Sequence, residues 1–455
     1  MTRSLAHIPF SPAKCPVFYG WPVVAVGALG VLMSVPGQTM GVSVFTDSLL
    51  TALGLTRGQL STAYMCGTIG SACLMPYAGR LYDRLGSRVM AVVASVSLAI
   101  VLVVLSRSDV VAGHVATAFG LAAPTAAYAV IALAFFALRF WGQGVLTLTS
   151  HNMVAKWFDR RRGLASGLSG ILTAMGFSIA PLALDGLIRQ FGWRGAWVMM
   201  AAVVGGLFAV VASALYRDNP EDCGLRPDGA PPAEPDTANE EATSEPCWTL
   251  AEARRTWAFW TFSLSLALSA LYTTGLTFHV VSIFDGAGMA RTQAVMIFLP
   301  ISVVAVLARF ASGWLSDRVA LQWLLAGMLA SMATSMVGLS NLKPGWPVAM
   351  IITGNGLSMG IFGLLSAVTW ANYFGRRHLG AISGLNMSMI VLLSAIGPVL
   401  FSTSLSRTGS YRSAALACLL ATAVLLAAAA RTRRPTQTRL WKGAPSGWRN
   451  PPATP

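Results

Sequence analysis

The chain carries little charge for its length. Of its 455 residues, 11 % are Asp, Glu, Lys or Arg, against about 25 % in a typical soluble domain. Hydrophobic residues make up 55 % of the chain. This balance excludes a water-soluble globular protein and indicates an integral membrane protein whose surroundings are the lipid bilayer.

Acidic residues are scarcer still. The sequence has 17 Asp and Glu against 32 Lys and Arg, and its formal net charge is +15. Such a surplus can indicate binding to nucleic acid, but only when the cations gather on a soluble face. Here they fall mostly in short connectors between apolar runs, so no nucleic-acid partner is expected.

The motifs of catalysis and of nucleotide binding are missing. The sequence contains no GxxxxGK[ST] loop, and its apolar runs contain no paired carboxylates, so nothing indicates nucleotide hydrolysis or acid–base chemistry. Its six cysteines form no CxxC pair, so we predict neither a metal site nor a disulfide framework. We expect a protein that is not an enzyme and that needs no cofactor.

Apolar runs account for most of the chain. Each is long enough to cross a hydrocarbon core of about 30 Å as a helix, so we predict an all-α polytopic protein with twelve transmembrane helices. The runs are 19–46, 59–80, 88–106, 126–154, 163–188, 195–216, 256–284, 293–315, 320–341, 346–373, 379–404 and 411–430.

The runs fall into two groups of six. Residues 217–255 separate the groups and hold ten carboxylates, including all six glutamates of the chain. A segment of this composition is typical of a solvated linker. We therefore expect five parts, namely an N-terminal tail (1–18), an N-terminal half (19–216), the linker (217–255), a C-terminal half (256–430) and a C-terminal tail (431–455).

The connectors indicate how the protein lies in the membrane. Outside the linker, eighteen cations lie on the side shared by the two termini and eight on the other side. The positive-inside rule then places both termini in the cytoplasm. The first 18 residues contain three prolines and no apolar region with a cleavage site, so we interpret them as a retained tail. We expect a monomer in the cell's inner membrane.

Segments that recur along the chain indicate two related halves. Residues 79–84 read Gly-Arg-Leu-Tyr-Asp-Arg, and residues 313–318, 234 positions later, read Gly-Trp-Leu-Ser-Asp-Arg. Residues 157–161 are echoed by residues 373–377. Such repeats are typical of carriers in which two halves rock about a site near the middle of the membrane.

The two Asp-Arg turns lie on the cytoplasmic side of this topology. There, charge pairs and helix-end contacts can hold the inner ends of the helices together. We interpret the turns as an inner gate, although the arginines can also merely set topology while the aspartates cap helices. The gate candidates are Asp83, Arg84, Arg88, Asp317 and Arg318.

Two cations lie deep in the apolar runs. Arg309 is about two turns, or roughly 12 Å, inside the end of its run, and the matching position of the first half is Met75. Arg139 is about 25 Å from Lys156 along its helix. Ionisable residues inside a membrane are functional candidates by default. For Arg139, a structural hydrogen-bonded role and a part in coupling remain equal alternatives.

The motifs resemble those of the major facilitator superfamily, and within it the monocarboxylate porters and oxalate–formate exchangers. The repeated Asp-Arg turns resemble the signature between helices 2 and 3 of the superfamily. The similarity to the porters lies in Tyr19-Gly20-Trp21, in Phe158-x-Arg160-Arg161-Arg162-x-Leu164-Ala165-x-Gly167, and in the segment 219–229.

This resemblance implies a secondary transporter for a small organic anion, with the major facilitator fold. It also implies that Arg309, in its Ala-Arg pair, binds the substrate carboxylate, for which a planar guanidinium is well suited. The alternative is an arginine that snorkels toward the headgroups. One central cation favours a monocarboxylate over a dicarboxylate. Further substrate-binding candidates are Gln38, Asn355, Asn386 and His279.

Coupling is where the sequence departs from the porters. Their helix 8 has an aspartate one turn before the arginine, and this chain has Ala305 there. We take His279 as the histidine within the spans and hence as the candidate proton carrier; a hydrogen-bonded histidine that never carries charge is at least as good an interpretation. The coupled species is then a proton or a counter-anion.

Two other functions remain open. One is export of a larger amphipathic compound through a cavity lined by Trp141, Trp370 and methionines, although such side chains are more often plain packing. The other is a non-transporting membrane sensor that signals through residues 217–255 or its basic tail.

Overall fold

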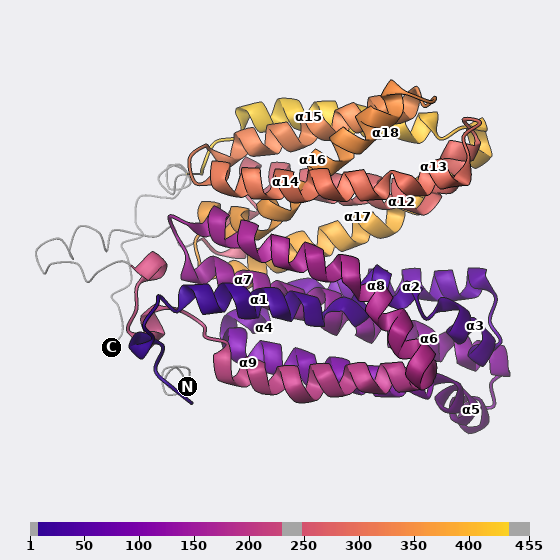
Figure 1. Cartoon of the computed structure of the whole chain (residues 1–455), viewed down its shortest axis with the longest axis horizontal. Helices are drawn as coiled ribbons and strands as arrows, with labels where there is room; N and C mark the ends of the chain where they lie inside the picture. Colours follow the sequence, from indigo (N-terminus) through magenta and orange to yellow (C-terminus); the bar gives the residue numbers. More distant parts are fainter. Residues whose placement is uncertain (1–7, 230–247, 436–455) are drawn as a thin grey trace, which may run out of the picture.

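The computed structural model describes residues 8–229 and 248–435, and in this part of the chain every regular element is a helix. The helices run along one long axis (Figure 1). Those of the N-terminal half form one side of the bundle and those of the C-terminal half the other. Both termini lie at one end, which we name the terminal end, and α3 (Thr46–Leu53) and α5 (Ser108–Phe119) lie at the distal end.

The remaining elements have the following bounds. In the N-terminal half they are α1 (Gly20–Met33), α2 (Thr39–Ser43), α4 (Arg57–Ser106), α6 (Ala123–Leu138), the π-helical segment η3 (Arg139–Leu146), α7 (Thr147–Trp157), α8 (Arg162–Ala201), the π-helical segment η4 (Ala202–Phe208) and α9 (Ala209–Leu215). From the linker onward they are α11 (Leu250–Ala253), α12 (Trp257–Asp285), α13 (Arg291–Met296), α14 (Phe298–Ser316), α15 (Leu321–Ser340), α16 (Trp346–Phe374), α17 (Leu379–Thr408) and α18 (Arg412–Arg431).

Two of the nine long apolar helices are too long to be single spans. At 1.5 Å per residue, the 50 residues of α4 would extend about 75 Å. Gly86 (φ 80°) interrupts α4, and Gly192 (φ 68°) interrupts α8, in backbone conformations that favour glycine. With each of these helices counted as two spans and the shorter α1 added, the described residues contain twelve spans, which confirms the prediction.

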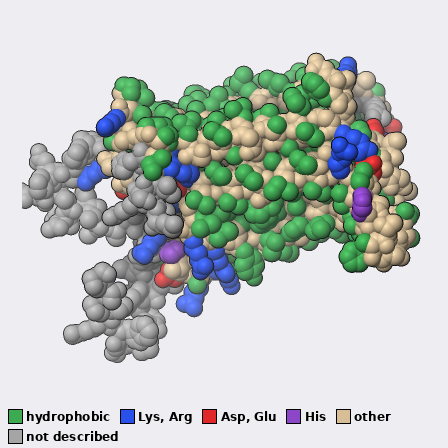
Figure 2. All heavy atoms as spheres, turned by 90° about the horizontal axis from the view of Figure 1, so that it is seen from below, with side chains coloured by type: hydrophobic (Ala, Val, Ile, Leu, Met, Phe, Trp, Pro, Cys, Tyr) green, Lys and Arg blue, Asp and Glu red, His purple; other side chains and the backbone are tan. Residues whose placement is uncertain are grey.

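Each half has its own apolar core, and the outside is apolar as well. A broad hydrophobic surface covers the middle of the bundle, while Lys and Arg side chains gather toward its two ends (Figure 2). A bilayer requires this distribution, because charged side chains are costly in hydrocarbon. The halves meet mainly where α4 packs against α17 and where α8 packs against α14.

Two connectors are more ordered than the sequence suggested. The described ends of the linker pack on the bundle instead of being solvated, because Arg217, Cys223 and Trp248 are each about 1 % exposed. Residues 230–247, which include four of the linker's prolines and Cys247, lie outside the described residues. The connector 107–125 contains α5, whose Asp109 forms a two-pronged ion pair with Arg194 at 2.7 Å.

Candidate substrate path between the two halves

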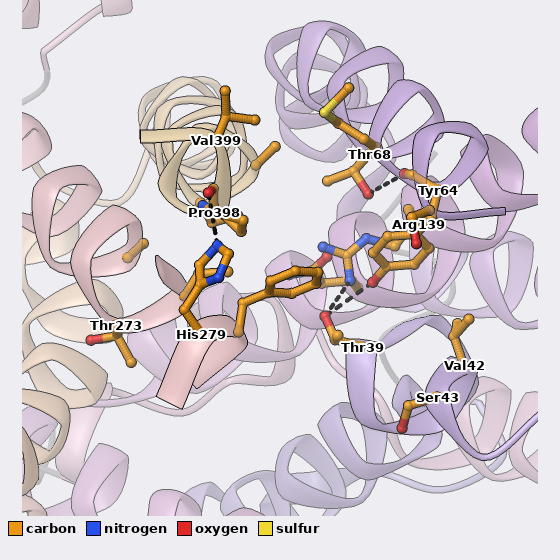
Figure 3. Close-up of a pocket in the computed structure, with 18 of the residues that line it drawn as sticks. Thr39, Val42, Ser43, Tyr64, Thr68, Arg139, Thr273, His279, Pro398 and Val399 are labelled. Carbon is orange, nitrogen blue, oxygen red and sulfur yellow. Dashed lines mark hydrogen bonds between the residues drawn. The ribbon is translucent and has the colours of Figure 1, made fainter. Parts of the chain in front are cut away.

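A cavity of about 720 Å³ lies between the halves. Its walls come from α2 and α4 on one side and from α12 and α17 on the other, and they include residues 60–62 and 402–403 near the distal end. Figure 3 shows Arg139, Tyr64 and Thr39 on one wall and His279 with Pro398 on the facing wall. The cavity therefore gives access to the interface between the halves from the distal end.

Arg139 lines this cavity and is only 3 % exposed. Its Nη1 donates to the carbonyl of Gly37 at 3.2 Å and to the hydroxyl of Thr39 at 3.4 Å. Its guanidinium carbon lies 5.2 Å from the ring centre of Tyr64. No ion pair with Arg139 occurs among the described residues, so its charge is held by dipoles and a ring face alone.

His279 lines the facing wall. Its Nε2 is 3.0 Å from the carbonyl oxygen of Pro398, and its Nδ1 is 3.4 Å from the hydroxyl of Tyr411. A carbonyl accepts only, so Nε2 carries a proton and donates. The geometry matches the hydrogen-bonded interpretation of this histidine.

Arg309, on α14, does not line the cavity in this conformation. Its guanidinium lies between α8 and α16, so closely packed that a side chain at Gly170 would collide with its Nε and one at Gly363 would come within 2.8 Å of its Nη1. The Nε is buried without a hydrogen-bond partner. The side chain of Arg309 is thus half-buried at the junction between the halves, with its Nε inside the packing.

A second histidine, for which no role was predicted, lies inside a span. His151 is in α7 and interacts electrostatically with Arg309. The apolar run 126–154 already contained it, so the signal was present in the sequence. His279 is therefore not the sole histidine candidate of the described spans.

The other substrate-binding candidates lie apart from this cavity. Gln38 donates to the hydroxyl of Ser34 at 3.0 Å. Asn355 is buried and accepts from Thr273, a cavity residue, at 3.3 Å. Asn386 is buried and its Oδ1 has no partner. Neither Trp141 nor Trp370 lines this cavity.

Two aspartates close the bundle at the terminal end. Asp83 accepts from the backbone N–H groups of Gly380 and Ala381, at 2.7 and 2.8 Å. These groups begin α17 in the other half, where free N–H groups and the helix dipole favour an anion. The carboxylate therefore ties the N-terminal half to the C-terminal half.

Asp317 makes the same contact in the reverse direction. It accepts from the N–H groups of Gly163 and Leu164, at 2.8 and 3.1 Å, and so ties the C-terminal half to the start of α8. Burial raises the pKa of Asp317, and the two hydrogen bonds oppose this shift. The two turns are thus equivalent in structure as well as in sequence.

The arginines of these turns do not share this role in the contacts that the structure shows. Arg88 donates to the carbonyls of Tyr216 and Ile8, within its own half and its tail. Arg318 lies over the ring of Trp314 at 4.0 Å and donates to the carbonyl of that residue. Arg84 is exposed.

Carboxylates of the linker reinforce the same end, and the sequence analysis did not foresee them. Asp218 accepts from the N–H groups of Ser87 and Arg88. Asp228 accepts from three successive N–H groups, at residues 159–161. Glu221 pairs with Arg376 of the other half at 2.8 Å. Two of these carboxylates, Glu221 and Asp228, belong to the segment 219–229, which therefore fastens loops at the terminal end.

A family model for the Major Facilitator Superfamily matches residues 27–398. The chain belongs to this superfamily. It is thus a membrane transporter and not an enzyme. The resemblance that its turns and repeats suggested is confirmed.

Relatives with known names indicate the breadth of this group. Monocarboxylate transporter 11 of Mus musculus is 29 % identical over 338 residues, which cover 69 % of each chain. The probable nitrate/nitrite transporter NarK2 of Mycobacterium tuberculosis is 25 % identical over 416 residues, covering 90 % of this chain and 91 % of the relative.

Solved structures agree on the fold. The outward conformation of the transporter FucP superimposes with a TM-score of 0.61 at 15 % identity, covering 91 % of this chain and all of the other. The proton:xylose symporter XylE gives a TM-score of 0.63 at 15 % identity, covering 94 % of this chain and 96 % of the other. At this identity the likeness concerns architecture alone.

Proposed function

We propose that this transporter moves a small organic anion, a monocarboxylate, by alternating access of its two halves. One observation carries the proposal. Arg309 is enclosed between α8 of one half and α16 of the other, with a buried Nε that lacks a partner. The relationship to monocarboxylate transporter 11 supports the choice of substrate class.

The energetics favour an anionic ligand. An enclosed cation without a counter-ion costs several kcal/mol in desolvation. A carboxylate offsets this cost by Coulomb attraction and by two parallel hydrogen bonds from the guanidinium. Arg309 supplies one positive charge, so a monoanion leaves the closed site neutral, whereas a dianion leaves one negative charge in a medium that disfavours it.

The conformation fits one stage of the transport cycle. With the terminal end in the cytoplasm, the cavity opens outward and the contacts of Asp83 and Asp317 keep the inner side closed. When those contacts break and α8 separates from α14, Arg309 becomes open to the cytoplasm. Gln38, Asn355 and Asn386 then join the site only if the rocking motion brings them to it.

The coupled species is a proton or a counter-anion. The mid-span region offers no acid, and His151, beside Arg309, is positioned to respond to an anion bound there. Proton symport would use this histidine or His279. Anion exchange needs neither.

A second candidate substrate is a small inorganic monoanion such as nitrate. The relationship to NarK2, which covers nine-tenths of the chain, favours it. Nitrate is planar and singly charged, and its oxygens can accept from a guanidinium much as a carboxylate does.

A thermal-shift series on the purified protein tests the proposal. Pyruvate, lactate, succinate, citrate and nitrate are compared at equal ionic strength, because a ligand that binds the folded state raises the Tm. We expect the monocarboxylates to raise the Tm and Arg309→Gln to weaken this response. A response to succinate alone, or an undiminished response of Arg309→Gln, would contradict the proposal.

A further inference from the structure

Arg139 is the one residue among Asp, Glu, Lys and Arg on the walls of the described cavity. The other polar wall residues are mostly Ser and Thr, with Tyr64, Gln143 and His279 among them. A cavity with one fixed positive charge and no fixed negative charge attracts anions from the side to which it opens.

Two irregular backbone segments position Arg139. The helix of the first span breaks at Pro36, which has no N–H group to donate. The backbone of Gly37 then packs directly against Gly142, within the π-helical segment η3 that begins at Arg139. Single π-helical turns are frequent at functional sites. The break and the π turn together bring the guanidinium to the cavity wall.

A purely structural arginine would satisfy its charged nitrogens with protein acceptors. Arg217 does so with its two terminal nitrogens, because Nη1 and Nη2 donate to four carbonyl oxygens, those of Ala214, Tyr216, Ile8 and Phe10, while its Nε has no partner. The terminal nitrogens of Arg139 have fewer acceptors, namely one carbonyl and one hydroxyl on Nη1 and the side chain of Tyr64 beside the guanidinium. Buried charges are normally paired more fully than this.

We propose that Arg139 is a second anion site, at which the substrate carboxylate binds from the outside before it reaches Arg309. Hydroxyl groups of Thr39 and Tyr64, which are 3.0 Å apart and adjoin the guanidinium, complete the site. The two arginines lie in different halves, one open to the distal end and one enclosed. This inference rests on the proposed function, and it assigns Arg139 to substrate recognition instead of to coupling or structure.

The apparent affinity for substrate on each side of the membrane distinguishes this role from a structural one. The half-saturation concentration for pyruvate is measured from each side, in right-side-out and inside-out vesicles. We expect Arg139→Gln to raise the outside value about 10- to 100-fold, the range for a lost hydrogen bond to a charged group, and to leave the inside value within about twofold. For Arg139→Lys, which keeps the charge, the outside value should lie between those of the wild type and Arg139→Gln. Equal changes on both sides, or a reduced maximal rate with both half-saturation values unchanged, would overturn the inference.

A matched control removes a nearby charge that is not in the cavity. Arg57 lies at the distal end, and its exposed ion pair with Asp47 is worth little. Arg57→Gln makes the same change in net charge as Arg139→Gln. Its half-saturation concentrations for pyruvate should stay near those of the wild type on both sides. If the outside value rises as much as in Arg139→Gln, the effect comes from general electrostatic attraction and the inference is wrong.

Binding can also be observed without transport. Ser43 lies on the cavity wall, so Ser43→Cys, with the exposed Cys66 and Cys73 changed to serine, gives a thiol for an impermeant reagent added outside. We expect pyruvate to slow the labelling, and Arg139→Gln to abolish this protection.

The outcomes distinguish the two claims. Arg139-dependent protection without pyruvate flux in the wild type would refute the proposed function and leave the anion site standing. Flux with protection that does not depend on Arg139 would refute the site and leave the function standing. Absence of both, with nitrate as well as with pyruvate, would refute both.

Discussion

Three arginines of this protein, the buried Arg139 and Arg217 and the half-buried Arg309, differ in what surrounds their charge. Arg217 donates to four carbonyl oxygens and serves as a structural tie. Arg139 is partly satisfied at the wall of a cavity. Arg309 is enclosed between the halves with an unpartnered Nε. A guanidinium is therefore a candidate for binding an anion where few protein acceptors surround it. Burial alone does not identify such a residue.

Replacement of Arg309 by lysine keeps the charge and removes the planar fork. If the carboxylate accepts two parallel hydrogen bonds, we expect Arg309→Lys to raise the half-saturation concentration for pyruvate at least about tenfold. Arg309→Ala should give a folded but inactive protein. Uptake is measured in proteoliposomes, and folding by gel filtration in detergent. Wild-type affinity in Arg309→Lys would show that the fork does not recognise the substrate.

The two histidines of the spans give opposite expectations. The ring of His279 is hydrogen-bonded to Pro398 and Tyr411, whereas His151 interacts electrostatically with Arg309. If uptake is proton-coupled, we expect its rate to rise as the pH falls through the histidine range. His151→Gln should remove this dependence and His279→Gln should keep it. The reverse pattern would restore His279 as the proton carrier, and a flat profile would favour anion exchange.

Among the elements, we propose that the starts of α8 and α17 form the inner closure, through their contacts with Asp317 and Asp83. A carboxylate at a helix N-terminus contributes about 0.5–2 kcal/mol. Loss of one such contact should shift the population toward the inward-open state by up to about 30-fold, with substrate affinity little changed. The measurement uses a cysteine introduced between the halves on the cytoplasmic side. We expect a thiol reagent added from the cytoplasm to label this cysteine faster in Asp83→Asn than in the wild type.

The control for the gate is Asp47→Asn, which removes the same charge at the distal end, where the ion pair of Asp47 with Arg57 is exposed. Accessibility should not change in this variant. Equal accessibility in Asp83→Asn and the wild type would leave the turn with a role in topology alone.

The helix α5 is clamped by its ion pair with Arg194, which holds the pKa of Asp109 at about 2. A lowered carboxylate pKa stabilises the folded state above the ordinary Asp value, and the contribution is lost as the pH falls toward 2. The pair is partly exposed, so we expect Asp109→Asn to lower the Tm by only about 1–3 °C at pH 7. The difference from the wild type should shrink below about pH 4; a difference that grows in acid would contradict the clamp.

For the whole molecule, the sequence predicted the architecture well and the site only in part. Apolar runs and repeated turns suffice for twelve spans, because each helix must satisfy its own backbone and present apolar side chains to lipid. The aspartate turns were also foreseeable, since the same Gly-x-Leu-x-Asp-Arg pattern occurs in both halves.

The cavity could not be foreseen from the pattern. Which face of a helix meets the other half depends on packing, so Gln38, Asn355 and Asn386 were equal candidates with residues that do line the wall, such as Thr39 and Tyr64. The packing of the linker on the bundle could not be predicted from the sequence either. Its acidic composition indicated solvation, but its carboxylates bind helix starts and loops at the gate.

Counterflow tests the central claim most directly. Proteoliposomes are loaded with unlabelled pyruvate and diluted into a trace of labelled pyruvate, with no gradient of pH or voltage. A carrier that works by alternating access should accumulate the label transiently above its equilibrium level, and Arg309→Ala should not. If the wild type binds pyruvate, as seen from a raised Tm, yet never brings internal label above the level of empty vesicles, the protein is a sensor and the account of it as a carrier is wrong.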